Sequence, residues 1–339
     1  MQQTAVRPAT RAYLTQVARV VRLSPQFLRI TLTGEDLEHF GPAGTGTTGL
    51  EAAASPVAWD QRIKLFLPRP DGTLPELGLF ADPPATIMEW YSAWRVLDDA
   101  ERNPIRTYTV RAIRTYAREV DIDFVIHIDD DGHSGPASAW ALGAEPGDEL
   151  VIIGPDRRSE ESGGGIDFTP GSARDLMLAG DETAVPAICA ILEGLPESYS
   201  GEAFLEVPTS DDVLDVASRS SVRIYWLPRD GASHGAALNS AVRDWGIRRA
   251  KIFAARRAAW EPGREPVGAL TGTPQELPEL DDDAVLWETV APEGFREYAW
   301  LAGEAGVIAG LRRYLVKEVG LSRKQVSFMG YWKYGRESA

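Results

Sequence analysis

The sequence predicts two domains, an N-terminal antiparallel β-barrel followed by a doubly wound α/β domain with a parallel sheet. Three observations predict this plan. The 339 residues are too many for one ordinary hydrophobic core. Short strand-like runs bounded by Gly, Pro or Asp fill the first half, whereas strand-like and helix-like runs alternate in the second. We therefore expect a barrel domain over 1–156, a linker over 157–172 and an α/β domain over 173–339.

The strands of the first domain are predicted from alternating apolar residues and from turn residues. ARVVRLSPQFLRITLTG contains two alternating runs joined by a Ser-Pro turn, and further strands follow in RIKLFLP, TYTVRAIR, EVDIDFVIHI and DELVIIGP. Residues 41–56 are rich in Gly, Ala and Thr and predict an exposed loop. TIMEWYSAWRVLDDAERNP, residues 86–104, has helical spacing, so we expect a helix inserted before the TYTVRAIR strand.

The second domain follows a polar, Gly-rich stretch, RRSEESGGGIDFTPGS, which is the predicted linker. Strands are expected in RDLMLAGD, EAFLEVP, VRIYWLP, YAWLAG and QVSFMGYW, and helices in ETAVPAICAILEGL, GAALNSAVRDWG and EAGVIAGLRRYLVKEVG. Residues 263–283 predict an irregular insertion. Such alternation favours a parallel sheet, and sheets of this kind bind ligands at the carboxyl ends of their strands.

Composition and charge exclude several classes of protein. The formal net charge of −15 argues against nucleic acid and anionic membranes as partners. No run of about 18 apolar residues predicts a membrane span, and no secretory signal is recognisable at the start, so a cytoplasmic protein is expected. The single cysteine, Cys189, and four scattered histidines offer neither a disulfide nor a metal-binding motif. Redox chemistry would therefore need an organic cofactor. The sequence does not predict an oligomeric state.

The motif RTYT, residues 106–109, places unusual side chains in one strand. Arg106 and Tyr108 point to one face of such a strand, and Thr107 and Thr109 point to the other. A guanidinium on that face can bind a pyrophosphate, and a tyrosine two residues later can lie against a flat heteroaromatic ring. Thr109 would meet the edge of such a ring only if the strand ended there. The alternative is a half-exposed strand with ordinary cross-strand pairs.

Two further motifs combine glycine with the start of a helix. In HSGPASAWA, Pro136 suits the first helical position after Gly135, and Ala137 and Ser138 offer amides and a hydroxyl to an anion, although a plain helix start is an alternative. LAGDETAVPA, residues 178–187, joins a buried strand to a helix, with Asp181 or Thr183 as the expected N-cap. It is not GxGxxG, so the motif alone is weak for a dinucleotide. WLAGEAG, residues 300–306, repeats the strand–glycine–helix arrangement.

The order RTYT, DFVIH, GPASAWA, AGDETAVPAI, WLAGEA and SFMGYWKYGR strongly resembles the siderophore-interacting proteins. These are FAD-containing, NAD(P)H-dependent ferric-siderophore reductases of the ferredoxin-reductase superfamily. The resemblance runs over nearly the whole chain and departs from the family at residues 129–134 and 264–283. It implies FAD bound by Arg106, Thr107, Tyr108, Thr109, His127, Gly135, Pro136, Ala137 and Ser138, and NADH or NADPH bound near Asp181, Thr183, Ala302, Gly303 and Glu304. A core position is an equal alternative for His127.

The resemblance also implies a reaction and a substrate site. Hydride would pass from NAD(P)H to FAD, and single electrons would then reduce the Fe(III) of a siderophore or other ferric chelate, which releases Fe(II). No side chain is expected to act as a catalytic acid or base. Because ferric siderophores are often anionic, basic residues are expected around them, although each could be a solvated surface charge. The predicted substrate residues are Lys64, Arg157, Arg158, Lys333 and Trp332, the last of which covers the flavin or fills a sheet edge.

Alternative functions and the choice of electron donor stay open. A general ferric-chelate or flavin reductase, or a non-catalytic, flavin-containing siderophore-binding protein, would have similar motifs. A reductase that takes electrons from a ferredoxin is disfavoured by the complete second domain. The second α/β strand ends in EVPTSDD, where Asp211 and Asp212 favour a free ribose hydroxyl and therefore NADH.

Overall fold

The computed structural model describes residues 7–43, 57–128, 132–161, 164–258 and 286–335. The chain forms two compact units, Met1–Ile166 and Asp167–Ser338. The predicted linker, 157–172, spans the division between them. The exposed loop expected at 41–56 and the insertion expected at 263–283 lie largely or wholly outside the described residues.

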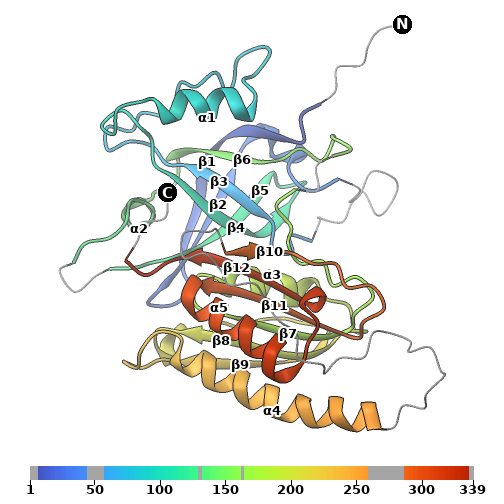
Figure 1. The fold of residues 1–339 in the computed structure, drawn as a ribbon. Coiled ribbons are helices and arrows are strands. Elements are labelled where there is room, and N and C mark those ends of the chain that lie inside the picture. The colour runs from blue at the N-terminus through green and yellow to red at the C-terminus, as the bar shows by residue number, and fades with distance from the viewer. Residues whose placement is uncertain (1–6, 44–56, 129–131, 162–163, 259–285, 336–339) are drawn as a thin grey trace, which may run out of the picture. The chain divides into compact units, whose positions relative to one another are not determined.

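The first unit is a closed six-stranded barrel in which every pair of neighbouring strands is antiparallel (Figure 1). The predicted antiparallel barrel is therefore confirmed. The strand order is β1-β2-β5-β4-β3-β6. The strands are β1 Thr10–Arg22, β2 Phe27–Thr33, β3 Arg62–Phe66, β4 Ile105–Arg114, β5 Glu119–Val125 and β6 Glu149–Pro155, and the helices are η1 Glu35–His39, α1 Ile87–Arg95 and α2 Pro136–Gly143.

Alternation along the strands builds the barrel interior. Ile30 and Leu32 on β2, and Ile122 and Phe124 on β5, are fully buried. Asp123, the residue between Ile122 and Phe124, is charged and pairs with Arg29 of β2. This pattern commits one face of each strand to the core, which fixes the pairing register.

The inserted helix α1 is shorter than its sequence pattern predicts. It starts after a capping box formed by Thr86 and Glu89 and ends at Arg95, although helical spacing suggested residues 86–104. The segment after it is fixed by Asn103, whose side chain donates to the carbonyl oxygens of Leu67 and Thr73. Since Asn103 precedes a proline, helical backbone is disfavoured there.

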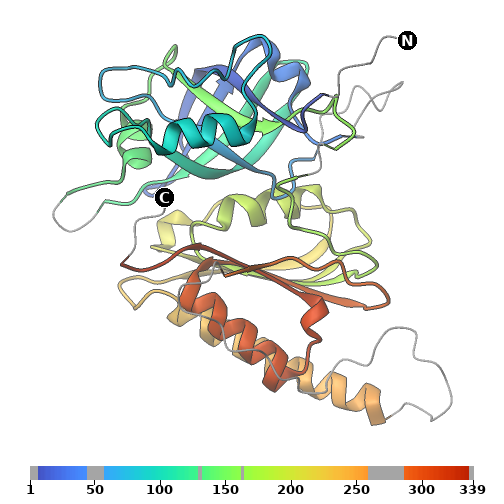
Figure 2. The same cartoon turned by 45° about the horizontal axis from the view of Figure 1, so that its top comes forward.

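The second unit is a six-stranded sheet with the order β10-β12-β11-β7-β8-β9. All pairs are parallel except that of β10 with β12, at one edge. Figure 2 shows α3 on one face of the sheet and α4 and α5 on the other, which confirms the predicted largely parallel α/β fold. The strands are β7 Asp175–Gly180, β8 Ser200–Val207, β9 Ser221–Pro228, β10 Trp287–Glu288, β11 Glu297–Glu304 and β12 Val326–Trp332, and the helices are α3 Val185–Gly194, η3 Ser210–Asp212, α4 Ala236–Ala258, α5 Ala305–Tyr314, η4 Leu315–Val319 and η5 Arg323–Gln325.

Helix α4 extends well beyond the stretch that the sequence pattern predicted, 235–246. The pattern suggested an end at Gly246, but this glycine serves packing instead. A Cβ atom there would lie 2.5 Å from the Tyr314 hydroxyl of α5. The glycine thus lets α4 and α5 approach each other, and the helix continues past it. The core on this side of the sheet includes Trp245, Leu311 and Phe328. Within the described part of the chain, no helix is long and apolar enough to cross a membrane.

Candidate functional site

The barrel brings the RTYT and GPAS stretches into neighbouring elements. The Tyr108 ring on β4 lies 4.4 Å from the ring of Phe124 on β5, measured between centroids. Phe124 in turn lies 5.7 Å from the ring of Trp140 on α2. A continuous aromatic contact therefore joins the strand that carries Arg106 to the helix that begins at Pro136.

Arg106 is suited to bind an anion. It is partly buried, and its guanidinium donates to its own neighbour, the carbonyl oxygen of Ile105, at 2.9 Å. In the part of the chain that the structure describes, it pairs with no carboxylate. By contrast, Arg29 and Arg114 of the same barrel each bind an aspartate. Arg106 thus keeps most of its donors for a phosphate or carboxylate of a ligand.

Helix α2 offers a second anion-binding feature. Its N-cap is Gly135, which provides no side-chain cap, and Pro136 is at the start of the helix. The amides of Ala137 and Ser138 lie in the first turn, where no preceding helical carbonyl can accept from them. The Ser138 hydroxyl is engaged differently from what the motif suggests: it accepts from the His127 amide at 3.2 Å and contacts the Val125 carbonyl oxygen at 3.3 Å.

The predicted roles of His127, Tyr108 and Thr109 depend on where their side chains lie. His127 is exposed, so it is not a core histidine. Burial raises the pKa of the Tyr108 phenol, although Arg106 opposes this, and the hydroxyl stays protonated as a hydrogen-bond donor at neutral pH. Thr109 is buried and pairs across the sheet with Arg62. Because β4 continues to Arg114, the strand does not end at Thr109, and a contact of this hydroxyl with a cofactor stays a prediction.

The basic residues predicted for the substrate lie at different places in the barrel. The Lys64 ammonium donates to the Thr107 hydroxyl at 2.6 Å, opposite it on β4. Although the Lys64 side chain as a whole is exposed, its ammonium is partly desolvated, and this effect and the neighbouring Arg62 lower its pKa. Arg158 binds Asp156 at 2.6 Å, and Arg157 contacts Thr115 beyond the far end of β4. Lys64 is therefore separated along the strands from both arginines.

In the second unit, Asp181 joins several segments at the carboxyl end of the sheet. It follows β7, and its carboxylate accepts from the backbone amides of Thr183 at 3.0 Å and Glu304 at 2.8 Å. Its Oδ2 also accepts from the indole of Trp332 at 3.0 Å. Gly303 permits this approach, because a Cβ atom there would lie 2.5 Å from the same oxygen. The N-cap of α3 is Ala184, so the expectation of Asp181 or Thr183 as N-cap is wrong.

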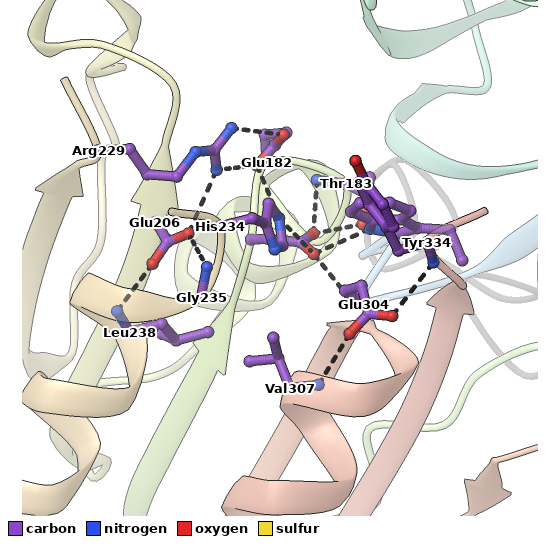
Figure 3. A network of polar contacts seen from close by, with 12 residues as sticks. Glu182, Thr183, Glu206, Arg229, His234, Gly235, Leu238, Glu304, Val307 and Tyr334 are labelled. Atoms are coloured by element: carbon purple, nitrogen blue, oxygen red, sulfur yellow. Dashed lines mark hydrogen bonds and ion pairs between the residues drawn. The ribbon is translucent and has the colours of Figure 1, made fainter. Parts of the chain in front are cut away.

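Two more carboxylates occupy helix N-termini at this edge (Figure 3). Glu206, at the end of β8, accepts from the amides of Gly235 at 2.7 Å and Leu238 at 2.8 Å, where α4 begins. Glu304 caps α5 by accepting from the Val307 amide at 2.8 Å. These side chains fill the positions where helix amides would otherwise meet a phosphate.

An ion-pair network connects the ends of β7, β8 and β9. Arg229, directly after β9, makes two hydrogen bonds with Glu182, of 2.6 and 2.9 Å, and one with Glu206 of 3.3 Å. The His234 Nε2 atom lies 3.4 Å from Asp181 and 3.7 Å from Glu182. Although burial opposes both charges, these partners raise the pKa of His234 to about 10 and lower that of Glu182 to about 2. Both groups are thus ionised at neutral pH.

The same network explains a cluster of potential metal ligands. Oxygen and nitrogen atoms of Asp181, Glu182 and His234 lie within 4.8 Å of one another. Asp181 already accepts from two amides and an indole, and Glu182 is bound by Arg229. The protein's own donors therefore hold these oxygens, as expected for an ion-pair network.

Most residues predicted at this edge lie together. Ala302, Gly303 and Glu304 are the last three residues of β11, and Trp332 ends β12 with its ring 5.0 Å from that of His234. Lys333 follows and is partly buried.

The sequence did not predict four charged residues of this edge, which are Glu182, Glu206, Arg229 and His234. A signal existed, since charged residues follow three apolar strand runs, and the carboxyl ends of parallel strands meet at one edge.

Comparisons with known proteins agree with the two units. A model of the siderophore-interacting FAD-binding domain matches residues 16–159, and a model of the siderophore-interacting protein matches residues 173–335. The chain is 30% identical to the ferric vibriobactin reductase of Vibrio cholerae over 325 residues, which cover 95% of this chain and 90% of that protein. It is 31% identical to an NADPH-dependent ferric-chelate reductase of Escherichia coli over 217 residues, 63% of this chain and 70% of that protein.

A solved structure shows the same fold. The crystal structure of a siderophore utilization protein from T. fusca superposes with a TM-score of 0.62 at 26% sequence identity. The superposition covers 97% of this chain and 95% of that one. The likeness therefore includes both units.

Proposed function

The chain belongs to the siderophore-interacting protein family, and from this premise we propose that it is an FAD-dependent reductase that releases iron from ferric siderophores with electrons from NADH or NADPH. The proposal is carried by two features of the same unit: Arg106, which is partly buried and has no carboxylate partner among the described residues, and the N-terminus of α2, which has no side-chain cap. Both features suit a pyrophosphate, and they lie in the unit that matches the family's FAD-binding domain.

The residues of the barrel suggest how FAD would be held. Arg106 and the amides of Ala137 and Ser138 would hold the pyrophosphate. Tyr108 lies next to the Phe124 ring and keeps its phenolic proton, so it would pack against the flavin ring and donate a hydrogen bond. When bound, FAD accepts a hydride and supplies single electrons, which is the conversion that Fe(III) reduction needs.

The second unit would bind the nicotinamide nucleotide at the carboxyl end of its sheet. Asp181, Gly303 and Glu304 lie there beside the ends of β7 and β11. The proposed role of Asp181 is to hold these segments in register, because its carboxylate already accepts from Thr183, Glu304 and Trp332. The cytoplasm, where NADH and NADPH are available, is the proposed place of action.

Lys64 is the proposed contact for an anionic ferric chelate. It is exposed, and its partner is a neutral hydroxyl, that of Thr107, so its positive charge is not neutralised there. Arg158 is a weaker candidate because Asp156 binds its guanidinium. Arg157, Trp332 and Lys333 remain proposed substrate residues.

The test uses the purified full-length protein under anaerobic conditions. Bound FAD is identified by its absorbance spectrum. NADH or NADPH is then added together with a ferric siderophore and a chelator that reports Fe(II). We expect the flavin absorbance to bleach and Fe(II) to form. Bleaching by neither nucleotide would exclude both as donors, and bleaching without Fe(II) would indicate another electron acceptor.

A general ferric-chelate reductase is the second candidate, favoured by the similarity to the Escherichia coli ferric-chelate reductase. Rates with a ferric siderophore and with ferric citrate separate the two. Similar kcat/KM values for both chelates would favour the general reductase. Tight binding of the siderophore without any reduction would instead indicate a flavin-containing binding protein.

A further inference from the structure

Arg229 directly follows β9 at the carboxyl end of the sheet, where the candidate nucleotide site lies. Three segments follow the carboxyl ends of β7, β8 and β9 and lead to the next helix: 181–184, 208–209 and 229–235. Their cationic side chains are Arg229 and His234. In α/β sheets that bind dinucleotides, an acidic residue in this region binds a free ribose 2′-hydroxyl, whereas an arginine accommodates a 2′-phosphate. The state of Arg229 therefore bears on the choice between NADH and NADPH.

Three hydrogen bonds to buried carboxylates engage both terminal nitrogens of the Arg229 guanidinium. Both of its terminal nitrogens bind the two oxygens of Glu182, and one also binds Glu206. The side chains of Glu182 and Glu206 are 3% and 0% exposed, so water screens these pairs little. The bidentate geometry uses the donors that a phosphate would need.

The other charges at this edge also disfavour a phosphate. Three carboxylates, those of Asp181, Glu182 and Glu206, face two cations, Arg229 and His234. Asp230, exposed directly after Arg229, adds a further negative charge and accepts from the Ser210 amide. The local charge is therefore negative even with His234 protonated.

We propose that Glu182 withholds Arg229 from the nucleotide, so that the protein selects NADH over NADPH. The inference rests on the proposed function and names the donor for it. It also changes the basis of the preference for NADH. Asp212, which the sequence suggested near the ribose, is fully buried and accepts from the amide and hydroxyl of Thr209, so it is not available to a ribose.

The experiment measures flavin bleaching by NADH and by NADPH, and binding of NAD⁺ and NADP⁺ to the oxidised protein by calorimetry. For the unmodified protein we expect kcat/KM to favour NADH by about tenfold or more, the effect of one missing charge-assisted contact. Glu182→Gln removes the charge that holds both terminal nitrogens of Arg229 and leaves the 3.3 Å bond to Glu206, so it should raise the NADPH-to-NADH ratio by about tenfold. The double variant Glu182→Gln/Arg229→Gln should lose this gain, because the freed guanidinium is gone.

Controls separate release of Arg229 from a general loss of negative charge. Glu197→Gln makes the same chemical change on the exposed loop after α3, and we expect it to leave the ratio unchanged. Asp215→Asn removes an exposed charge from the segment after η3 without touching Arg229, and it should change the ratio by less than about twofold. A shift with Asp215→Asn as large as that with Glu182→Gln would overturn the role of Glu182.

The single variant Arg229→Gln tests the proposal even if Glu182→Gln fails to fold. Because the guanidinium is already engaged, this variant should leave the ratio unchanged. A selective loss of NADPH use or of NADP⁺ binding would show that Arg229 already contacts a 2′-phosphate, and the proposal would be wrong. Equal use of both nucleotides by the unmodified protein would also overturn it. Failure of the proposed function has a different signature: chemically reduced flavin would then produce no Fe(II) from a ferric siderophore.

Discussion

The indole of Trp332 donates to Asp181 Oδ2 at 3.0 Å and thereby ties the end of β12 to the end of β7, 151 residues away in sequence. The same oxygen accepts from the Glu304 amide, and β11 lies between the two strands. One buried carboxylate thus aligns the ends of three strands. The contribution of this carboxylate to stability should come mainly from the hydrogen-bond donors that it satisfies.

Removal of this carboxylate is expected to destabilise the second unit. Asp181→Ala leaves the amides of Thr183 and Glu304 and the indole of Trp332 without their acceptor, so the free energy of unfolding should fall by about 3 kcal/mol. Trp332→Phe removes one donor and keeps the ring, and should cost about 1 kcal/mol. Urea unfolding followed by circular dichroism measures both. Equal losses would contradict the shared-acceptor role of Asp181.

Arg106 should determine how tightly FAD is held. Arg106→Ala removes the guanidinium proposed for the pyrophosphate, and the dissociation constant for FAD should rise by about 10- to 100-fold. Arg106→Lys keeps the charge without the planar fork and should restore affinity only in part. Fluorescence titration of the apoprotein with FAD measures the constant. Arg158→Ala, which breaks a pair with Asp156 instead, is the control, and an equal effect there would argue against a specific role for Arg106.

Substitution of Lys64 should weaken binding of the iron substrate without changing the FAD content. Lys64→Met removes the charge but keeps the length of the side chain, and KM for anionic ferric chelates should rise about fivefold or more. Burial and Arg62 lower the pKa of Lys64, so its contribution should fade at a lower pH than that of an ordinary lysine. Thr107→Val removes the hydrogen bond but keeps the Lys64 charge, so KM should rise less than in Lys64→Met when both variants are compared at full FAD occupancy. Loss of FAD from Lys64→Met would instead indicate a structural role.

The sequence predicted best those features that depend on local alternation. The barrel strands and the shared face of Arg106 and Tyr108 follow from a period of two. The lengths of α1 and α4 were missed because tertiary contacts decided them. Asn103 fixes the segment after α1, and Gly246 makes room for Tyr314 where the sequence pattern suggested a helix end.

The ion-pair network could not be predicted in the same way. Glu182 and Arg229 are 47 residues apart, and their contact depends on the sheet order β7-β8-β9. Each residue taken alone looks like an ordinary surface charge after a strand. Only the parallel arrangement brings the strand ends together, and only packing decides that Arg229 turns toward Glu182 and Glu206.

His234 should make the stability of the second unit depend on pH, and the direction follows from its raised pKa. Burial opposes the cation, but Asp181 and Glu182 raise the pKa of His234 to about 10, above about 6.5 for an unfolded chain. The folded state therefore binds the proton more tightly, so the stabilisation is complete below about pH 6.5 and is lost as the pH rises toward 10. Because the imidazole is partly solvated, His234→Gln should cost only about 1–2 kcal/mol at pH 6, and the difference should vanish near pH 10. Urea unfolding of both proteins across this range measures the difference.

His39→Gln is the control. Burial lowers the pKa of His39, so the pH dependence of its effect on stability should have the opposite sign. A His234→Gln difference that stays constant with pH would show that the imidazole is neutral in the folded protein.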